Sequence, residues 1–222
     1  MAGKRKEKLT AFNRGNILES ACQLFQEKGI AGTTMDDIAG TAEYSKTTIY
    51  CYFNGKKDLV NHLVFEGMEM FKNKLGEESE KSGDFADFYE RFCALVSENH
   101  DKHPIYYEGL SGPVSCDSNT PADDICKKIY ISGEEADQIA EEKMVRAVKA
   151  KEIAMDDDMR ATMMFMWFCV MGIIEKTAAK EGYITLRTGK TKAEFLDFAF
   201  KKLFRLLETE KSNTETRHNQ QA

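Results

Sequence analysis

Four polar side chains fall at helical spacing in the stretch from residue 45 to residue 53, SKTTIYCYF. Lys46, Thr47, Tyr50 and Cys51 occupy positions i, i+1, i+4 and i+5, which lie on one face of a helix. Together they offer a cation, two hydroxyl groups and a thiol. Such groups near the start of a helix can reach base edges and phosphates in the major groove of DNA. The chemistry that this spacing predicts is hydrogen bonding to a nucleic acid.

Two short helices are expected to position this face. Thr34 offers an N-cap oxygen with Asp37 three residues on, which starts a helix that ends near Thr41. Ser45 starts the second helix, and a turn of three or four residues around Glu43 joins the two. Their shared core consists of apolar residues from both: Ile38, Ala39, Ala42, Ile49 and Phe53. This is the layout of a helix-turn-helix.

The rest of the chain also shows helical rather than strand patterning. A helix from about Ala11 to Lys28, ended by Gly29, is expected to support the pair. Further helix starts are expected near Lys56, Asp84, Asp156–Asp158 and Thr191. A capping box of Ser132 and Glu135 indicates that the region from Ile125 to Met155 forms either two helices or one helix with an interruption at Gly133. We expect about nine helices and no sheet, an all-α fold.

Other kinds of chemistry find little support. No Ser/His/Asp, Cys/His or glycine-rich phosphate-binding arrangement is present, so we assign no catalytic residue and expect neither an enzyme nor a cofactor. His100 and His103 have ligand spacing around Asp101, but their place beside Pro104 favours a solvated turn over a metal site. The longest apolar stretch, Met163–Ile174, has twelve residues, whereas a membrane span needs about 20. A cytoplasmic protein without a membrane partner is expected, with its six cysteines reduced.

The charge balance argues against DNA binding at first. The chain has 31 basic and 37 acidic side chains, a net charge of −6, whereas a nucleic-acid binder usually shows a basic footprint. Residues 1–60, however, hold nine basic and seven acidic side chains, a balance of +2, and the remainder holds 22 and 30, a balance of −8. The acidity therefore belongs to the part of the chain that follows the helix-turn-helix.

The stretch from Arg14 to Leu59 resembles a known family. Its segments NRGNILESACQLFQEKG, TTMDDIA and SKTTIYCYFNGKKDL look like the DNA-binding domain of the TetR repressor family, in helix lengths, core positions and the Y-x-Y-F-x-x-K ending. The resemblance implies DNA-backbone contacts by five residues: Thr34, Thr48, Tyr50, Tyr52 and Lys56. It implies base contacts by three: Lys46, Thr47 and Cys51.

Two residues in the turn depart from the family pattern. Glu43 stands where the family usually has glycine, and Tyr44 where it usually has a small aliphatic residue. A left-handed conformation at Glu43 would cost about 1–2 kcal/mol. The departures bear on operator recognition more than on the fold.

The resemblance also implies a division of the chain. We expect a DNA-binding domain over residues 1–55, with residues 1–10 as a flexible basic arm, an effector-binding and dimerisation domain over 56–210, and a polar tail over 211–222. The last two helices are apolar over more than one face and match the family's dimer interface. A homodimer would read a palindromic double-stranded operator.

The second domain is rich in aromatic and methionine side chains, which suit an apolar ligand cavity or plain core packing. The pocket candidates are Phe88, Phe92, Tyr106, Tyr107, Met163, Trp167 and Met171. The function that follows is a repressor that releases its operator when a small, partly apolar molecule binds. The alternative is a helical small-molecule-binding protein or enzyme in which the N-terminal bundle is only structural.

Overall fold

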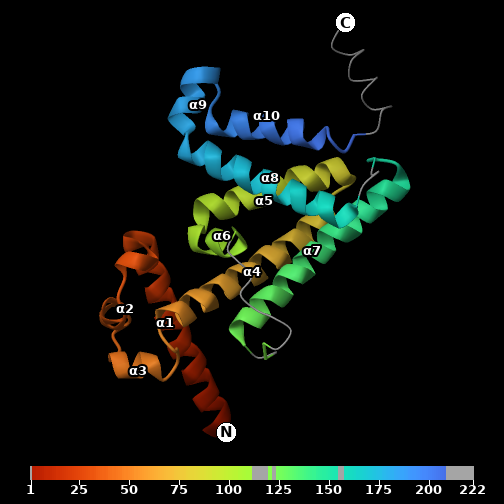
Figure 1. Ribbon diagram of the computed structural model, residues 1–222. Helices are drawn as coiled ribbons and strands as arrows, with labels where there is room; N and C mark the ends of the chain where they lie inside the picture. The colour runs from red at the N-terminus through yellow and green to blue at the C-terminus, as the bar shows by residue number, and fades with distance from the viewer. Residues whose placement is uncertain (1, 112–119, 122–123, 155–157, 209–222) are drawn as a thin grey trace, which may run out of the picture. The chain divides into compact units, whose positions relative to one another are not determined.

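The computed structural model describes residues 2–111, 120–121, 124–154 and 158–208, and in them it has ten α-helices (Figure 1). In chain order they are α1 (Ala2–Gly32), α2 (Met35–Ala42), α3 (Lys46–Tyr50), α4 (Lys56–Lys81), α5 (Phe85–Lys102), α6 (Pro104–Ser111), α7 (Ile125–Ala150), α8 (Met159–Ala179), α9 (Glu181–Thr188) and α10 (Lys192–Phe204). Within the described residues the only β contact is an isolated bridge between Ile153 and Glu208. The all-α prediction is confirmed, with ten helices rather than about nine.

The chain divides into two compact units, which we describe separately. Unit 1 consists of residues 1–70 and 103–133, and unit 2 of residues 71–102 and 134–222. Unit 1 therefore holds α6 and the first turns of α7 besides the helices expected for a DNA-binding domain. The tail over 211–222 and the residues Asp156 and Asp157 lie outside the described residues.

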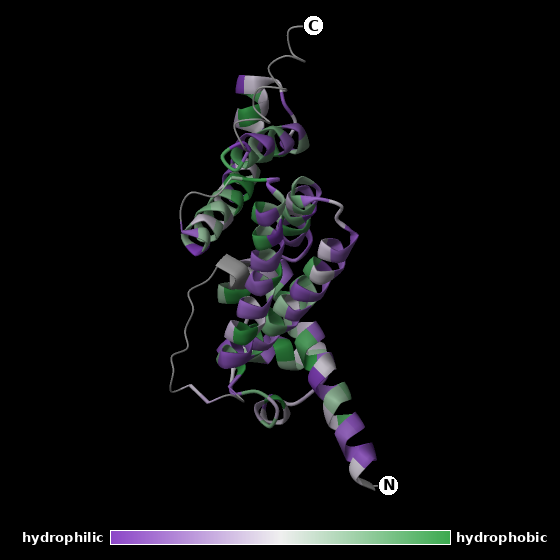
Figure 2. Cartoon of the chain, turned by 90° about the vertical axis from the view of Figure 1, so that its right-hand side faces the viewer, coloured by the Kyte–Doolittle hydropathy of each residue, from purple (hydrophilic) through white to green (hydrophobic). Residues whose placement is uncertain are grey.

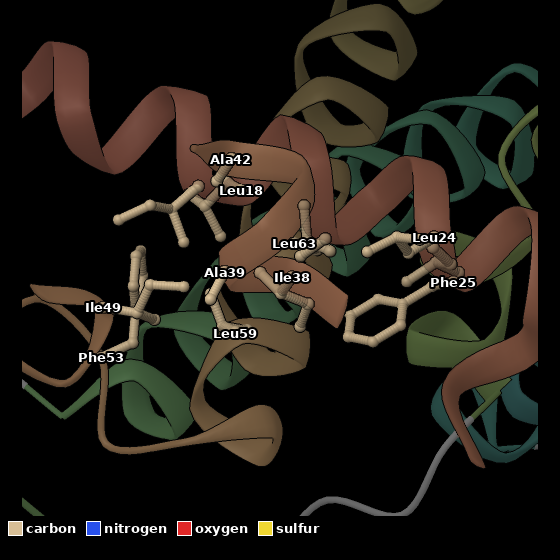
Figure 3. Packing of buried hydrophobic residues seen from close by; sticks show 13 residues of the cluster. Leu18, Leu24, Phe25, Ile38, Ala39, Ala42, Ile49, Phe53, Leu59 and Leu63 are labelled. Atoms are coloured by element: carbon tan, nitrogen blue, oxygen red, sulfur yellow. The ribbon is translucent and has the colours of Figure 1, made fainter. Parts of the chain in front are cut away.

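The core of unit 1 joins α1, α2, α3 and the start of α4 (Figure 3). The five core residues expected for the helix-turn-helix are all buried, and Ile38 and Ile49 have no exposed surface. They meet Ile17 and Phe25 of α1 and Leu59 of α4. The small helices are thus held by apolar contacts with two long ones, which supply the stability that short helices lack by themselves.

Local capping fixes where α2 and α3 begin. Thr34 and Asp37 form the expected capping box, and the hydroxyl of Ser45 accepts a hydrogen bond from the backbone N–H of Thr48. Helical dihedral angles fail at Gly29, where φ is 73°, close to the predicted end of the first helix. Glu43 ends α2 in the left-handed region with a φ of 59°, the conformation whose cost was considered for this position.

Unit 2 is built around α5, α8 and α10. Their facing sides bury apolar residues: Phe88 and Val96 from α5, Val170 and Ile174 from α8, and Leu196 and Phe200 from α10. Asp158 caps α8, and Thr191 with Glu194 forms the expected capping box at α10. The short helix α9 was not anticipated from the sequence, and it has no buried residue.

The expectation of a break near Gly133 needs correction. The pair Ser132 and Glu135 does not cap a helix, because α7 runs unbroken from Ile125 to Ala150. The hydroxyl of Ser132 donates instead to Glu69 Oε1 at 2.6 Å, and Glu135 accepts from Lys72 Nζ at 2.7 Å. These tertiary partners replace the local ones that a capping box requires.

The apolar stretch belongs to a helix longer than its twelve residues. In the described part of the chain, α8 is the one helix long and apolar enough to cross a membrane by length and composition, and 28% of its apolar window is buried. A single such helix is also found in the interior of water-soluble proteins. Its exposed apolar side chains, Met164, Phe165 and Phe168, call for a partner surface.

Candidate nucleic-acid interface

The outer face of α3 presents the four residues singled out by their spacing. Lys46, Thr47, Tyr50 and Cys51 are all exposed, whereas Ile49 between them is fully buried. Tyr50 exposes 49% of its surface, which is large for an aromatic side chain. The Cys51 thiol donates to the carbonyl oxygen of Thr47 at 3.3 Å, so it lies along the helix. The result is a short helix that offers hydrogen-bonding groups to a partner.

Lys46 already has a carboxylate partner within unit 1. Its ammonium donates to Asp36 Oδ2 at 2.9 Å, and this contact raises the pKa of Lys46. Both side chains are exposed, with 47% and 72% of their surface accessible. An exposed ion pair of this kind is worth about 1 kcal/mol or less, so a phosphate or a base edge can replace the carboxylate.

Thr34 and Thr48 lie where α2 and α3 begin. The Thr34 hydroxyl donates to Asp37 Oδ2 at 2.6 Å and accepts from the Asp37 backbone N–H at 3.1 Å. The Thr34 hydroxyl and, to a smaller extent, the Thr34 backbone N–H donate to the Asp37 carboxylate and lower its pKa to about 2. The Thr48 hydroxyl lies 2.7 Å from that of Ser45. Both threonines therefore fix helix ends, whatever contacts they make with DNA.

Lys56, which the resemblance places at the DNA backbone, has hydrogen-bond partners within unit 1. Its ammonium donates to the carbonyl oxygens of Ile30 at 2.7 Å and Thr33 at 2.9 Å. These carbonyls end α1 and lead into the N-cap of α2. Lys56 thus ties the start of α4 to the segment between α1 and α2, and two of its three N–H donors serve this purpose.

Tyr52 and Tyr44 share one partner on α1. Asn13 donates from Nδ2 to the Tyr52 hydroxyl at 2.9 Å, and its Oδ1 accepts from the Tyr44 hydroxyl at 2.9 Å. Tyr52 was expected at the DNA backbone, and Tyr44 was noted only as a departure from the family pattern. Asn13 could not be recognised from local patterns, because the residues that it joins are 31 and 39 positions away.

Arg14, beside Asn13, joins the segment after α3 to α4. It donates to the carbonyl oxygen of Tyr52 at 2.7 Å and to His62 Nε2 at 3.1 Å, and its guanidinium lies 4.4 Å from the centre of the Phe53 ring. Since Arg14 can only donate, His62 Nε2 acts as an acceptor and the imidazole is neutral. Burial and the positive charge of Arg14 both lower the pKa of His62, in agreement with that assignment.

The basic residues at the N-terminus belong to a helix. Residues 2–10, expected as a flexible arm, form the first turns of α1, with Lys4, Arg5, Lys6 and Lys8 exposed. Figure 2 shows these turns, next to the N label, as mainly hydrophilic. The exposed cations are therefore displayed on a helical scaffold continuous with the buried part of α1.

The seven pocket candidates divide between the units. Phe88, Phe92 and Trp167 form a series in unit 2, with ring centroids 6.4 Å and 5.9 Å apart in that order. Met171 is buried and Met163 half-buried in the same unit.

Tyr106 and Tyr107 belong to unit 1. A Cβ atom added at Gly67 would overlap the ring of Tyr106, so glycine is what allows α6 to pack closely on α4 there. The sequence could not foresee this placement, because the segment's aromatic residues suit either a pocket or this packing.

No group of three or more His, Cys, Asp or Glu side chains suited to a metal ion occurs among the described residues. Asp101, considered as part of a metal site, accepts two hydrogen bonds from Lys192 Nζ, at 2.6 and 2.7 Å, and lies 2.8 Å from His100 Nδ1.

Comparison with known proteins agrees with this geometry. Residues 17–63 match the sequence profile described as bacterial regulatory proteins, tetR family. The negative transcriptional regulator IcaR of the icaADBC biofilm operon in Staphylococcus aureus is 24% identical over 173 residues, which are 76% of this chain and 89% of IcaR. The probable transcriptional regulator YttP of Bacillus subtilis is 40% identical over 62 residues, 28% of this chain and 30% of YttP.

The fold has solved relatives too. The regulator FadR from Bacillus subtilis, solved in complex with stearoyl-CoA, is 17% identical, with a TM-score of 0.59 over 85% of this chain and 96% of FadR. The exposed face of α3, the capped helix-turn-helix beneath it and the profile match point the same way. Residues 17–63 of this chain therefore carry the DNA-binding helix-turn-helix of the tetR family of bacterial regulatory proteins.

Proposed function

We propose that this protein is a ligand-responsive repressor that binds a palindromic operator as a homodimer in the cytoplasm. The observation that carries the proposal is the exposed polar face of α3, Lys46 to Cys51, on a helix whose other side is locked into the core of unit 1. In this proposal residues 1–55 bind DNA and residues 56–210 bind the effector and the second subunit. IcaR is named as a negative transcriptional regulator, and this supports repression rather than activation.

The DNA contacts are expected to separate into two kinds. Tyr50→Phe removes the hydroxyl proposed to contact the DNA backbone. It should therefore weaken binding to all duplexes by a similar factor, worth about 1 kcal/mol. Lys46→Ala should change the preferred base instead, with a discrimination of about 1–3 kcal/mol lost at that position. Fluorescence anisotropy at fixed salt, on duplexes selected from a random library and on single-base variants of them, measures both effects.

Two exposed residues of unit 2 provide matched controls for these substitutions. Tyr183→Phe and Lys149→Ala remove the same groups far along the chain and should leave both affinity and base preference unchanged. If Tyr50→Phe and Lys46→Ala behave like these controls, the outer face of α3 is not the DNA-binding surface.

The dimer is proposed to form through α8 and α10. The sequence predicted an interface of the last two helices, and the structure has the short helix α9 between the apolar helices α8 and α10. The large apolar residues exposed on α8 and α10 are Met164, Phe165, Phe168 and Phe198. Charged side chains of both signs surround Phe198, including Glu194, Asp197, Lys201 and Lys202. A two-fold interface can pair such charges with their opposites in the second copy.

Phe168→Glu is expected to weaken self-association about 10- to 100-fold, because it buries a charge in an apolar contact. Sedimentation velocity over a concentration series, without DNA, measures this change. Phe12→Glu is the matched control, since Phe12 is 69% exposed on α1 in unit 1. An unchanged monomer–dimer equilibrium in Phe168→Glu would place the interface elsewhere.

The effector is proposed to contact the aromatic series of Phe88, Phe92 and Trp167 in unit 2. FadR, which shares the fold, was solved with a fatty acyl-CoA, and that supports an effector with an apolar part. Binding would favour a state with lower operator affinity. A coupling free energy of about 1–3 kcal/mol corresponds to a 5- to 150-fold loss of operator affinity.

A further inference from the structure

We infer that Asn13 is a positioning residue for the recognition helix α3 and sets the specificity of DNA binding without touching DNA. Asn13 is the common partner of Tyr44, which precedes α3, and Tyr52, which follows it, with both hydrogen bonds at 2.9 Å. A single amide side chain on α1 therefore holds the segments on both sides of α3. The inference rests on the proposed DNA-binding role of α3.

The helix needs such a restraint because it is short. It has five residues, and the only one of them that is buried is Ile49. One apolar side chain can hold the distance between α3 and the core, but it leaves rotation about the contact weakly restrained. Two hydrogen bonds placed before and after the helix restrain that rotation. The side chains of Lys46 and Thr47 then meet a base pair in one orientation.

Neighbouring contacts on α1 make Asn13 the centre of this restraint. Arg14 donates to the carbonyl oxygen of Tyr52, and Asn16 donates to the carbonyl oxygen of Ala42 at the end of α2. These two bonds reach backbone atoms and place the chain. Only the Asn13 amide, among the three, joins side chains on both sides of α3. The departure from the family pattern at Tyr44 thus has a structural purpose.

The consequence is a change in specificity rather than in affinity alone. A residue that merely stabilises unit 1 would, when replaced, lower the fraction of folded protein and weaken binding to all DNA in proportion. A residue that orients α3 affects base contacts but leaves electrostatic attraction to random DNA intact, because that attraction depends on the number of cations near phosphates. The ratio of the two affinities therefore separates the two roles.

The test compares two duplexes of about 30 base pairs, long enough for two half-sites. One is selected by the full-length wild-type chain from a randomised library, and the other has the same composition in scrambled order. Asn13→Leu keeps the number of side-chain heavy atoms and the branching at Cγ and removes both hydrogen bonds. We expect the ratio of the two dissociation constants to fall at least 10-fold, with binding to the scrambled duplex changed less than 2-fold. Tyr44→Phe, which removes one hydrogen bond, should give a smaller loss in the same direction.

Two further variants sharpen the result. Asn13→Asp can accept from both tyrosine hydroxyls, so it should keep the ratio within about 3-fold of wild type while its negative charge weakens both affinities. Gln23→Ala, which removes an exposed hydrogen bond to Glu27 on the same helix, should change nothing. In the double variant Asn13→Leu/Tyr44→Phe the losses should not add, since the hydrogen bond between Tyr44 and Asn13 is already absent in each single variant.

An equal loss on both duplexes, or no loss, in Asn13→Leu and Tyr44→Phe would overturn the inference. If the wild-type chain selects no duplex, the proposed function fails and the inference falls with it. The two failures are therefore distinguishable by the behaviour of the wild type. Melting curves followed by circular dichroism show whether Asn13→Leu folds, and Tyr44→Phe decides the matter if it does not.

Discussion

Replacing Phe53 with alanine is expected to lower the free energy of unfolding of unit 1 by about 3–5 kcal/mol. The side chain is 1% exposed and belongs to the same buried cluster as Ile49 and Leu59 (Figure 3). Its ring also receives the Arg14 guanidinium and packs edge-on against His62, with centroids 5.3 Å apart. Alanine would leave a cavity and remove both aromatic contacts.

Hydrogen exchange of the α1, α2 and α3 amides is the measurement that resolves this loss. The single tryptophan, Trp167, lies in unit 2, so its fluorescence would report on the other unit. Phe12→Ala is the matched control, because Phe12 is 69% exposed and its removal should cost less than about 0.5 kcal/mol. A loss below about 1 kcal/mol in Phe53→Ala would show that other side chains refill the site.

Lys56→Ala is expected to destabilise unit 1 by about 3 kcal/mol and to weaken operator binding as well. Two hydrogen bonds from a charged donor are lost, each worth about 1.5–3 kcal/mol, and the carbonyls of Ile30 and Thr33 lose their partner. Without this tie the segment that leads into Thr34 is less restrained. Amide exchange at the start of α2 and anisotropy on the selected duplex measure the two effects.

The neighbouring lysine supplies a matched control for Lys56. Lys57 is exposed and lies on the same helix, so Lys57→Ala should leave amide exchange in α2 unchanged. If Lys56→Ala weakens DNA binding but leaves amide hydrogen exchange in α2 as in wild type, the main role of the ammonium is to bind a phosphate and not to connect the helices. The resemblance to the family implies the former role, and the geometry adds the latter.

Local signals along the chain were enough to predict where many helices begin. Thr34 with Asp37 and Thr191 with Glu194 form their capping boxes within four consecutive residues, so no distant contact is needed to recognise them. The same pattern failed at Ser132 and Glu135, where Glu69 and Lys72 on α4 offered better partners than the local backbone. A capping motif is thus reliable only where the chain has no tertiary alternative.

In the candidate site, too, local patterns predicted some features and tertiary contacts decided others. Helical periodicity alone predicts that Lys46, Thr47, Tyr50 and Cys51 share an exposed face. The partners of Tyr52 and Lys56 could not be predicted, because they are a side chain and two carbonyl groups from α1 and the segment after it. Helix α9 was missed for a different reason: it buries no residue, and a helix without a buried face leaves no apolar period in the sequence.

The ion pair between Lys46 and Asp36 also bears on how the protein finds its target. An ammonium that already pairs with a carboxylate gains less binding free energy from a phosphate of non-specific DNA than an unpaired ammonium does. Glu43 adds a further negative charge in the turn. Weak attachment to random sequence shortens each stop while a protein slides and hops along DNA. We therefore expect the chain to test more positions in a given time than a variant without these acidic residues.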